Sequence, residues 1–162
     1  MGSEMCIRDR PITNLYRNNG FGIFTKIEGV PFVNVFYSSI SFADVDGDND
    51  EDVLIIGEDG SAAGFTKLYF NDGLGNFTES TNNSFAGETR GDVEFFDVDN
   101  DGDLDFLITG SLITSNGAST KLYINDGSGN FSEAPETNIT SIFDGDIAVE
   151  DVNQDGLSLI HI

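Results

Sequence analysis

An internal repeat constrains this chain more than any other feature of its sequence. The acidic segment FADVDGDNDEDVLI at 42–55 returns as FFDVDNDGDLDFLI at 95–108 and begins a third time as VEDVNQDG at 149–156. Successive copies are 53 and then 54 residues apart. A regular step of this size indicates a protein built from repeated supersecondary units that bury their apolar faces against one another.

A second motif follows the same step. LYRNNGFG at 15–22 recurs as LYFNDGLG at 68–75 and as LYINDGSG at 122–129. Two different motifs that share one period are not a chance match, so both belong to one structural unit.

The repeat predicts β-strands. Apolar residues alternate before each acidic loop, as in Ile40 and Phe42, which is typical of a strand with one buried face. The same alternation occurs at Val93 and Phe95 and at Ile147 and Val149. After the complete loops, the continuous apolar runs 53–56 and 106–108 predict strands covered on both faces.

The rest of the unit predicts two more strands. A third strand is expected at 66–70, and Asn-Asp-Gly turns begin at Asn71 and Asn125, where Asn and Gly tolerate the positive φ of tight hairpins. A fourth strand is expected from Phe77 or Phe131. Four antiparallel strands in about 54 residues have the size of a propeller blade.

The predicted fold is therefore all-β, with antiparallel four-stranded blades of an incomplete β-propeller and calcium-binding hairpin loops. Residues 11–39 would end one blade, 40–91 and 92–145 would be complete blades, and 146–156 would start another. We also expect Val93, Phe95, Phe106 and Ile108 to share one apolar layer with their counterparts Ile40, Phe42, Val53 and Ile55.

The two ends of the chain have a different predicted origin. Segments 5–10 and 157–162 can be back-translated into reverse-complementary strings, which is typical of a sequencing adapter read through at both ends. We expect 1–10 and 157–162 to be adapter-derived, the alternative being an ordinary N-terminus and a short apolar tail, and leave them out of fold reasoning. Cys6 and His161 lie there, and Trp is absent, so the remaining stretch has no disulfide framework and no Cys/His zinc site.

The formal net charge of −22 limits the possible partners. It repels the phosphates of nucleic acids and attracts divalent cations. The acids lie in short clusters between apolar runs, which argues against simple disorder. No apolar run approaches the roughly 20 residues of a membrane span, so membrane insertion is not expected.

The spacing of the acids predicts a metal site in each loop. Carboxylates recur at every second residue, and Gly102 in sixth place allows the sharp bend that turns them inward. Asn49 takes that place in the first loop and also tolerates positive φ. Hard oxygen ligands indicate calcium. The candidate ligands are Asp44, Asp46, Asp48, Asp50, Asp52, Asp97, Asp99, Asp101, Asp103, Asp105, Asp151, Asn153 and Asp155.

An EF-hand and a solvated acidic turn are the alternatives for these loops. An EF-hand needs flanking helices and an acid in twelfth place, whereas Ile55 and Ile108 stand there between predicted strands. A solvated turn does not explain two complete loops and a third opening in phase with the repeat. The third loop lacks the closing acid, because Leu159 is in ninth place.

The acidic hairpin followed by Leu-Tyr-x-Asn-Asp-Gly-x-Gly-x-Phe resembles the FG-GAP/VCBS repeat of integrin-α-like β-propellers, over nearly all of 11–156. The resemblance implies a closed propeller, an extracellular location (secreted or at the cell surface), and calcium in the hairpin between the first two strands of a blade. It implies side-chain ligands from the first, third, fifth and ninth positions of the two complete loops, with backbone carbonyls from Asp50 and Asp103 in seventh position. The implied side-chain ligands are Asp44, Asp46, Asp48, Asp52, Asp97, Asp99, Asp101 and Asp105.

The expected function is a calcium-stabilised binding or adhesion scaffold, with an unidentified protein or carbohydrate ligand and neighbouring blades of the same parent chain as partners. The alternatives are a non-catalytic propeller portion of an extracellular polysaccharide-active enzyme and a spacer between other domains. Catalysis is not expected, because catalytic motifs are missing and the regular acids are assigned to metal. The in-phase Tyr16, Tyr69 and Tyr123 could stack on sugars, but packing between blades is favoured because every repeat has one.

Overall fold

The computed structural model describes residues 11–60, 64–112, 117–135, 137–153 and 155–162. These residues form thirteen strands and no helix, and all strand pairs are antiparallel, as the sequence predicts for an all-β fold. The described residues therefore contain no helix that could cross a membrane. The predicted segment 1–10 lies outside the described residues.

The first complete sheet has four strands in sequence order. They are β3 (Phe36–Ala43), β4 (Asp52–Glu58), β5 (Gly64–Asn71) and β6 (Phe77–Glu79). The apolar run 53–56 lies in β4 and is at most 1% exposed, which confirms a strand covered on both faces. The prediction of four antiparallel strands per repeat is confirmed for this unit.

The second sheet repeats the first, but its opening strand is split. It contains β7 (Glu88–Thr89), β8 (Val93–Phe96), β9 (Asp105–Leu112), β10 (Gly117–Asn125) and β11 (Phe131–Glu133), and both β7 and β8 pair with β9. Arg90, between β7 and β8, has a φ of 56°, and its counterpart Tyr37 has a φ of 45° at an irregularity in β3. The same bulge thus interrupts both opening strands.

Two half sheets flank the complete ones. β1 (Leu15–Asn18) pairs with β2 (Phe24–Ile27), and by the repeat they correspond to β5 and β6. β12 (Ala148–Glu150) pairs with β13 (Leu159–His161), and they correspond to β3 and β4. β13 falls in the segment 157–162 that we expect to be adapter-derived, and its origin stays a prediction.

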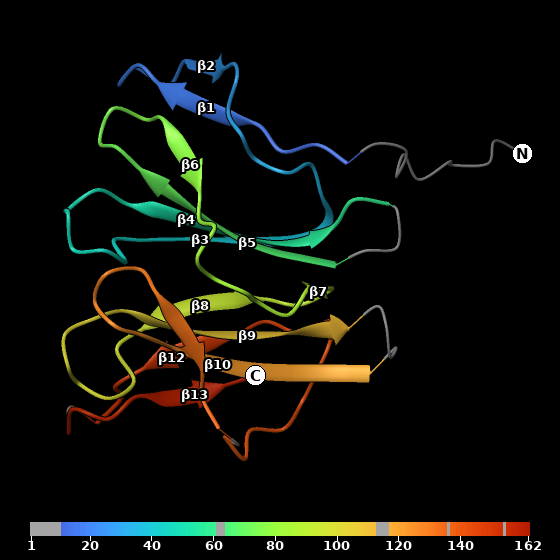
Figure 1. The fold of residues 1–162 in the computed structure, drawn as a ribbon, viewed down its shortest axis with the longest axis vertical. Coiled ribbons are helices and arrows are strands. Elements are labelled where there is room, and N and C mark those ends of the chain that lie inside the picture. Colours follow the sequence, from blue (N-terminus) through green and yellow to red (C-terminus); the bar gives the residue numbers. More distant parts are fainter. Residues whose placement is uncertain (1–10, 61–63, 113–116, 136, 154) are drawn as a thin grey trace, which may run out of the picture.

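The sheets are stacked face to face, with β1–β2 at one end of the stack and β12–β13 at the other (Figure 1). One apolar cluster joins the first sheet to the second, and it includes Leu54 and Ile56 of β4 and Phe106 and Ile108 of β9. A second cluster lies on the other face of the first sheet, and a third joins the second sheet to β12–β13. Each complete sheet therefore has an apolar cluster on both of its faces.

The prediction of a single apolar layer is wrong. Val93, Phe95, Phe106 and Ile108 pack between the two sheets, whereas Val53 and Ile55 belong to the cluster on the far face of the first sheet. Ile40 and Phe42 are 44% and 51% exposed. The two repeats still have the same orientation, because in each complete sheet these residues lie on the face that is turned away from the following unit. Among the described residues, however, the half sheet β1–β2 has no counterparts of β3 and β4 to cover Ile40 and Phe42.

Hydrogen bonds near the opening strands join successive units. Arg90 donates its backbone N–H to the carbonyl of Tyr37 at 3.1 Å, and Asp144 donates to the carbonyl of Arg90 at 2.7 Å. Asp92 accepts from the Ser39 hydroxyl at 2.5 Å and from the Ile147 backbone N–H at 2.9 Å. These bonds therefore join the opening strands of successive units and the segments next to them.

Candidate metal centre

The acidic loops connect the first two strands of each unit and lie along the same side of the stack (Figure 1). The first loop runs from 44 to 52, between β3 and β4, and the second from 97 to 105, between β8 and β9. The third begins at 151, after β12. In all three, one oxygen of the first carboxylate accepts the backbone N–H of the sixth residue: Asp44 from Asn49 at 2.9 Å, Asp97 from Gly102 at 3.0 Å, and Asp151 from Gly156 at 2.9 Å.

The sixth residue of each loop has the predicted left-handed backbone. The φ values are 71° at Asn49, 96° at Gly102 and 82° at Gly156. Asn49 therefore replaces glycine at this bend, as expected from its tolerance of positive φ. The fourth place has positive φ too, 78° at Gly47 and 61° at Asn100, which the sequence argument did not anticipate.

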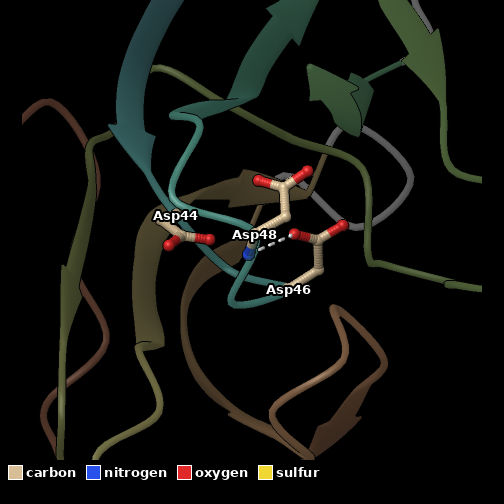
Figure 2. Close-up of side chains that lie close together, drawn as sticks. All are labelled: Asp44, Asp46 and Asp48. Carbon is tan, nitrogen blue, oxygen red and sulfur yellow. Dashed lines mark hydrogen bonds between the residues drawn. The ribbon is translucent and has the colours of Figure 1, made fainter. Parts of the chain in front are cut away.

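In the first loop, the structure brings together the carboxylates of Asp44, Asp46 and Asp48 (Figure 2). One oxygen from each lies within 4.8 Å of the others. Oxygens bound to one calcium ion at about 2.3–2.6 Å lie at most about 5 Å apart, so this set fits the ion. Burial, and then the neighbouring charge of Asp48, raise the pKa of Asp46, as expected where carboxylates gather without a cation.

The second loop gathers a different set, Asp97, Asp99 and Asp105. Here too, one oxygen from each residue lies within 4.8 Å of the others. Asp101 instead accepts the backbone N–H of Asp103 at 2.9 Å and is exposed. Both complete loops thus offer three convergent carboxylates, and all three are hard oxygen ligands of the kind that calcium prefers.

The closing acids Asp52 and Asp105 also hold the backbone of the loop. Both are 1% exposed. Asp52 accepts backbone N–H groups from Val45 at 3.2 Å and Asn71 at 2.8 Å. Asp105 accepts from Val98 and Asn125, each at 2.9 Å. Burial raises the pKa of Asp52 to about 6 and raises that of Asp105 as well. Loss of either side chain would therefore leave backbone groups unpaired besides removing an oxygen.

The acids in seventh place face the hairpin turn of their own unit. The carboxylate of Asp50 lies against Gly73, and that of Asp103 lies against Gly127, where a Cβ would collide with it. Both glycines have positive φ, 72° and 77°. The ligand role of the Asp50 and Asp103 carbonyls stays a prediction.

The third loop shares the opening geometry of the other two. Asp151 accepts the backbone N–H of Asp155 at 3.3 Å, and Asn153 donates its side-chain amide to the Asp155 carboxylate at 2.9 Å. Leu159 stands where the other loops have a buried acid, and it is 56% exposed. This loop therefore has only part of the predicted ligand set.

Sequence reasoning missed two residues that support the loops, Asn71 and Asn125. The sequence predicts a hairpin turn at each of them because asparagine tolerates a positive φ, but neither residue has a positive φ in the structure. Instead, the Asn71 side-chain amide donates to the carbonyl of Glu51 at 3.1 Å, and that of Asn125 donates to the carbonyl of Leu104 at 3.2 Å. The sequence signal that could have identified them is the recurrence of asparagine at this place in both repeats.

Two of the repeated tyrosines are buried rather than available for sugar stacking. Tyr69 and Tyr123 are 0% and 2% exposed, which confirms packing between units, whereas Tyr16 in the half sheet is 52% exposed.

Comparison with known proteins adds one finding. Residues 44–108, which include both complete loops, match the family model of the FG-GAP-like repeat. No curated protein and no solved structure gave a significant match.

Proposed function

This chain carries a repeat of the FG-GAP-like family, and from that premise we propose that its two complete sheets are blades of a β-propeller that acts as a calcium-stabilised binding or adhesion scaffold. The observation that supports calcium is the pair of in-phase clusters, each with three carboxylate oxygens within 4.8 Å of one another. Such clusters are electrostatically unfavourable alone, and a divalent cation converts their repulsion into attraction.

The proposed scaffold is extracellular, either secreted or at the cell surface. Calcium sites of extracellular modules commonly have Kd values of about 10⁻⁴ to 10⁻³ M. Exposed loops with three convergent carboxylates suit such weak sites. The proposed role is binding of a protein or carbohydrate ligand rather than catalysis.

The first prediction is that the chain binds two calcium ions, one in each complete loop. Isothermal titration calorimetry with calcium chloride should give a stoichiometry of about two. Asp46→Ala and Asp99→Ala should each remove one site. These residues are better targets than Asp52 or Asp105, because they do not hold buried backbone groups. Glu28→Gln, an exposed residue outside the loops that pairs with Lys26, is the matched control and should leave the stoichiometry unchanged.

Calcium should also stabilise the fold. At a free concentration of about 100 times Kd, each site adds roughly 2.7 kcal/mol to the free energy of unfolding. Urea unfolding with calcium, and with a chelator in its place, measures this difference. A chain that shows no binding heat, and whose stability the chelator leaves unchanged, would contradict the proposed function.

A further inference from the structure

The side chain of Asn125 lies between the two complete acidic loops and is 4% exposed. Its amide nitrogen donates to the carbonyl of Val45 in the first loop at 2.8 Å and to the carbonyl of Leu104 in the second loop at 3.2 Å. Its backbone N–H also donates to the carboxylate of Asp105 at 2.9 Å. One residue at the end of β10 thus holds both loops, although it is 80 residues from Val45.

The turn that follows Asn125 packs between the same loops. Gly127 lies against the Asp103 carboxylate of the second loop, and its carbonyl is near Gly47 of the first loop. The next glycine of the turn, Gly129, lies near the Cβ of Asp46. The contacts in the first loop are therefore to Val45, Asp46 and Gly47, within or next to its cluster of carboxylates.

Asn71 is a natural comparison for Asn125. It bonds its own loop in the same way, through its backbone N–H to Asp52 at 2.8 Å and its side-chain amide to Glu51 at 3.1 Å. Among the described residues, however, it donates no bond to the loop of another unit. The bond from Asn125 to Val45 therefore has no counterpart at Asn71, which is also less buried than Asn125.

We propose that Asn125 couples the two loops, so that calcium bound in one raises the calcium affinity of the other. This inference rests on the proposed function. Calcium that orders the second loop holds Leu104 and Asp105 in place, and with them Asn125. A correctly placed Asn125 then holds the Val45 carbonyl and the ligands on either side of it. Such coupling is reciprocal, so calcium in the first loop must favour the second by the same factor.

The test measures the affinity of one loop when the other is disabled. In the otherwise unchanged chain, Asp99→Ala removes the second site, and the first loop should then bind calcium at least about fivefold more weakly than it does with the second site filled. In the Asn125→Ser background, Asp99→Ala should change the first-loop affinity less than about twofold. The Gly127 backbone N–H donates to the side-chain oxygen of Asn125 at 3.2 Å, and serine keeps an oxygen there, but its shorter side chain lacks the amide that donates to both Val45 and Leu104. Isothermal titration calorimetry with calcium chloride gives each affinity.

The matched control is Asn71→Ser, in which the roughly fivefold effect of Asp99→Ala should persist. The reciprocal measurement uses Asp46→Ala and follows the second loop, where the same factor is expected. Circular dichroism at saturating calcium checks that each variant folds. If Asn125→Ser does not fold, the comparison of Asp99→Ala and Asp46→Ala with the unchanged chain still tests the coupling.

The outcomes separate this inference from the proposed function. Two bound calcium ions with independent affinities would overturn the coupling and leave the calcium sites intact. Coupling that survives Asn125→Ser would overturn the role of Asn125. Absence of calcium binding in the unchanged chain would overturn both.

Discussion

At the residue scale, Glu88 is the side chain that departs most from its repeat counterparts. Val35 and Ile142 occupy the same place in the units before and after it. Glu88 is fully buried in β7, and among the described residues neither carboxylate oxygen accepts a hydrogen bond with regular geometry. A polar group buried without partners typically costs about 1–3 kcal/mol.

Burial of the Glu88 carboxyl also changes its pKa. Burial raises this pKa above its ordinary value of 4.5, and the nearby Ser119 hydroxyl and Lys121 ammonium offset only part of the rise. The folded chain therefore retains the proton to higher pH than the unfolded chain does. The stability contribution of the protonated carboxyl is complete below about pH 4.5 and is lost as pH rises through the folded-state pKa.

We predict that Glu88→Leu raises the free energy of unfolding by about 1–3 kcal/mol at pH 7, because Ser119 and Lys121 offset only part of the cost of burying the charged carboxyl. The gain should shrink as pH falls towards 4.5. Urea unfolding at several pH values measures it, and Glu28→Leu, at an exposed position, should stay within about 0.5 kcal/mol of the unchanged chain. A destabilised Glu88→Leu variant would mean that the interactions of Glu88 with its neighbours outweigh the cost of burying its carboxyl.

At the element scale, a tyrosine of the third strand anchors the segment that leads into each complete sheet. The Tyr69 hydroxyl of β5 accepts the backbone N–H of Val33 at 3.0 Å, and the Tyr123 hydroxyl of β10 accepts that of Ala86 at 3.1 Å. The two bonds are in phase with the repeat. They give a reason for tyrosine rather than phenylalanine at this place in both complete sheets.

We predict that Tyr123→Phe destabilises the chain by about 1–3 kcal/mol, because the ring still fits but the N–H of Ala86 loses its acceptor. Tyr16→Phe is the matched control, since Tyr16 is exposed in the half sheet, and it should be nearly neutral. Thermal and urea unfolding compare the two variants. Equal effects would show that the hydroxyl bond of Tyr123 contributes nothing.

At the scale of the whole molecule, the stack leaves one apolar surface open. Ile40 and Phe42 on β3 are 44% and 51% exposed. In the next unit, the counterpart of Ile40, Val93, is 2% exposed, and the counterpart of Phe42, Phe95, is half-buried. The half sheets also have unpaired edges, which promote association between chains. The stack as described therefore offers both apolar area and strand edges to a second molecule.

We predict that the chain self-associates as its concentration rises, and that Phe42→Ser weakens this association. Sedimentation velocity over a range of concentrations measures it. Leu74→Ser, at an exposed hairpin tip, is the control and should leave the association unchanged. A monomer with a concentration-independent two-state melt would contradict the prediction.

Much of the local structure could be predicted from the sequence alone. The repeat period is visible in the sequence itself, and short-range rules predict the strands at 53–56 and 106–108 and the loop bends at Asn49 and Gly102. Strand alternation, turn residues and backbone preferences act between residues that are near in sequence, so their effects are present in the sequence itself. For the same reason, the acids of each loop could be recognised as one cluster.

Only the tertiary structure decided which residues meet across the stack. It assigned Asp48 to one cluster and Asp105 to the other, placed Asn125 between the loops, and buried Glu88 where other units have aliphatic residues. It also left Ile40 and Phe42 uncovered, although their pattern matches that of Val93 and Phe95, which pack between the two sheets. Burial and long-range hydrogen bonds depend on which unit is the neighbour, and a pattern repeated within each unit does not contain that information.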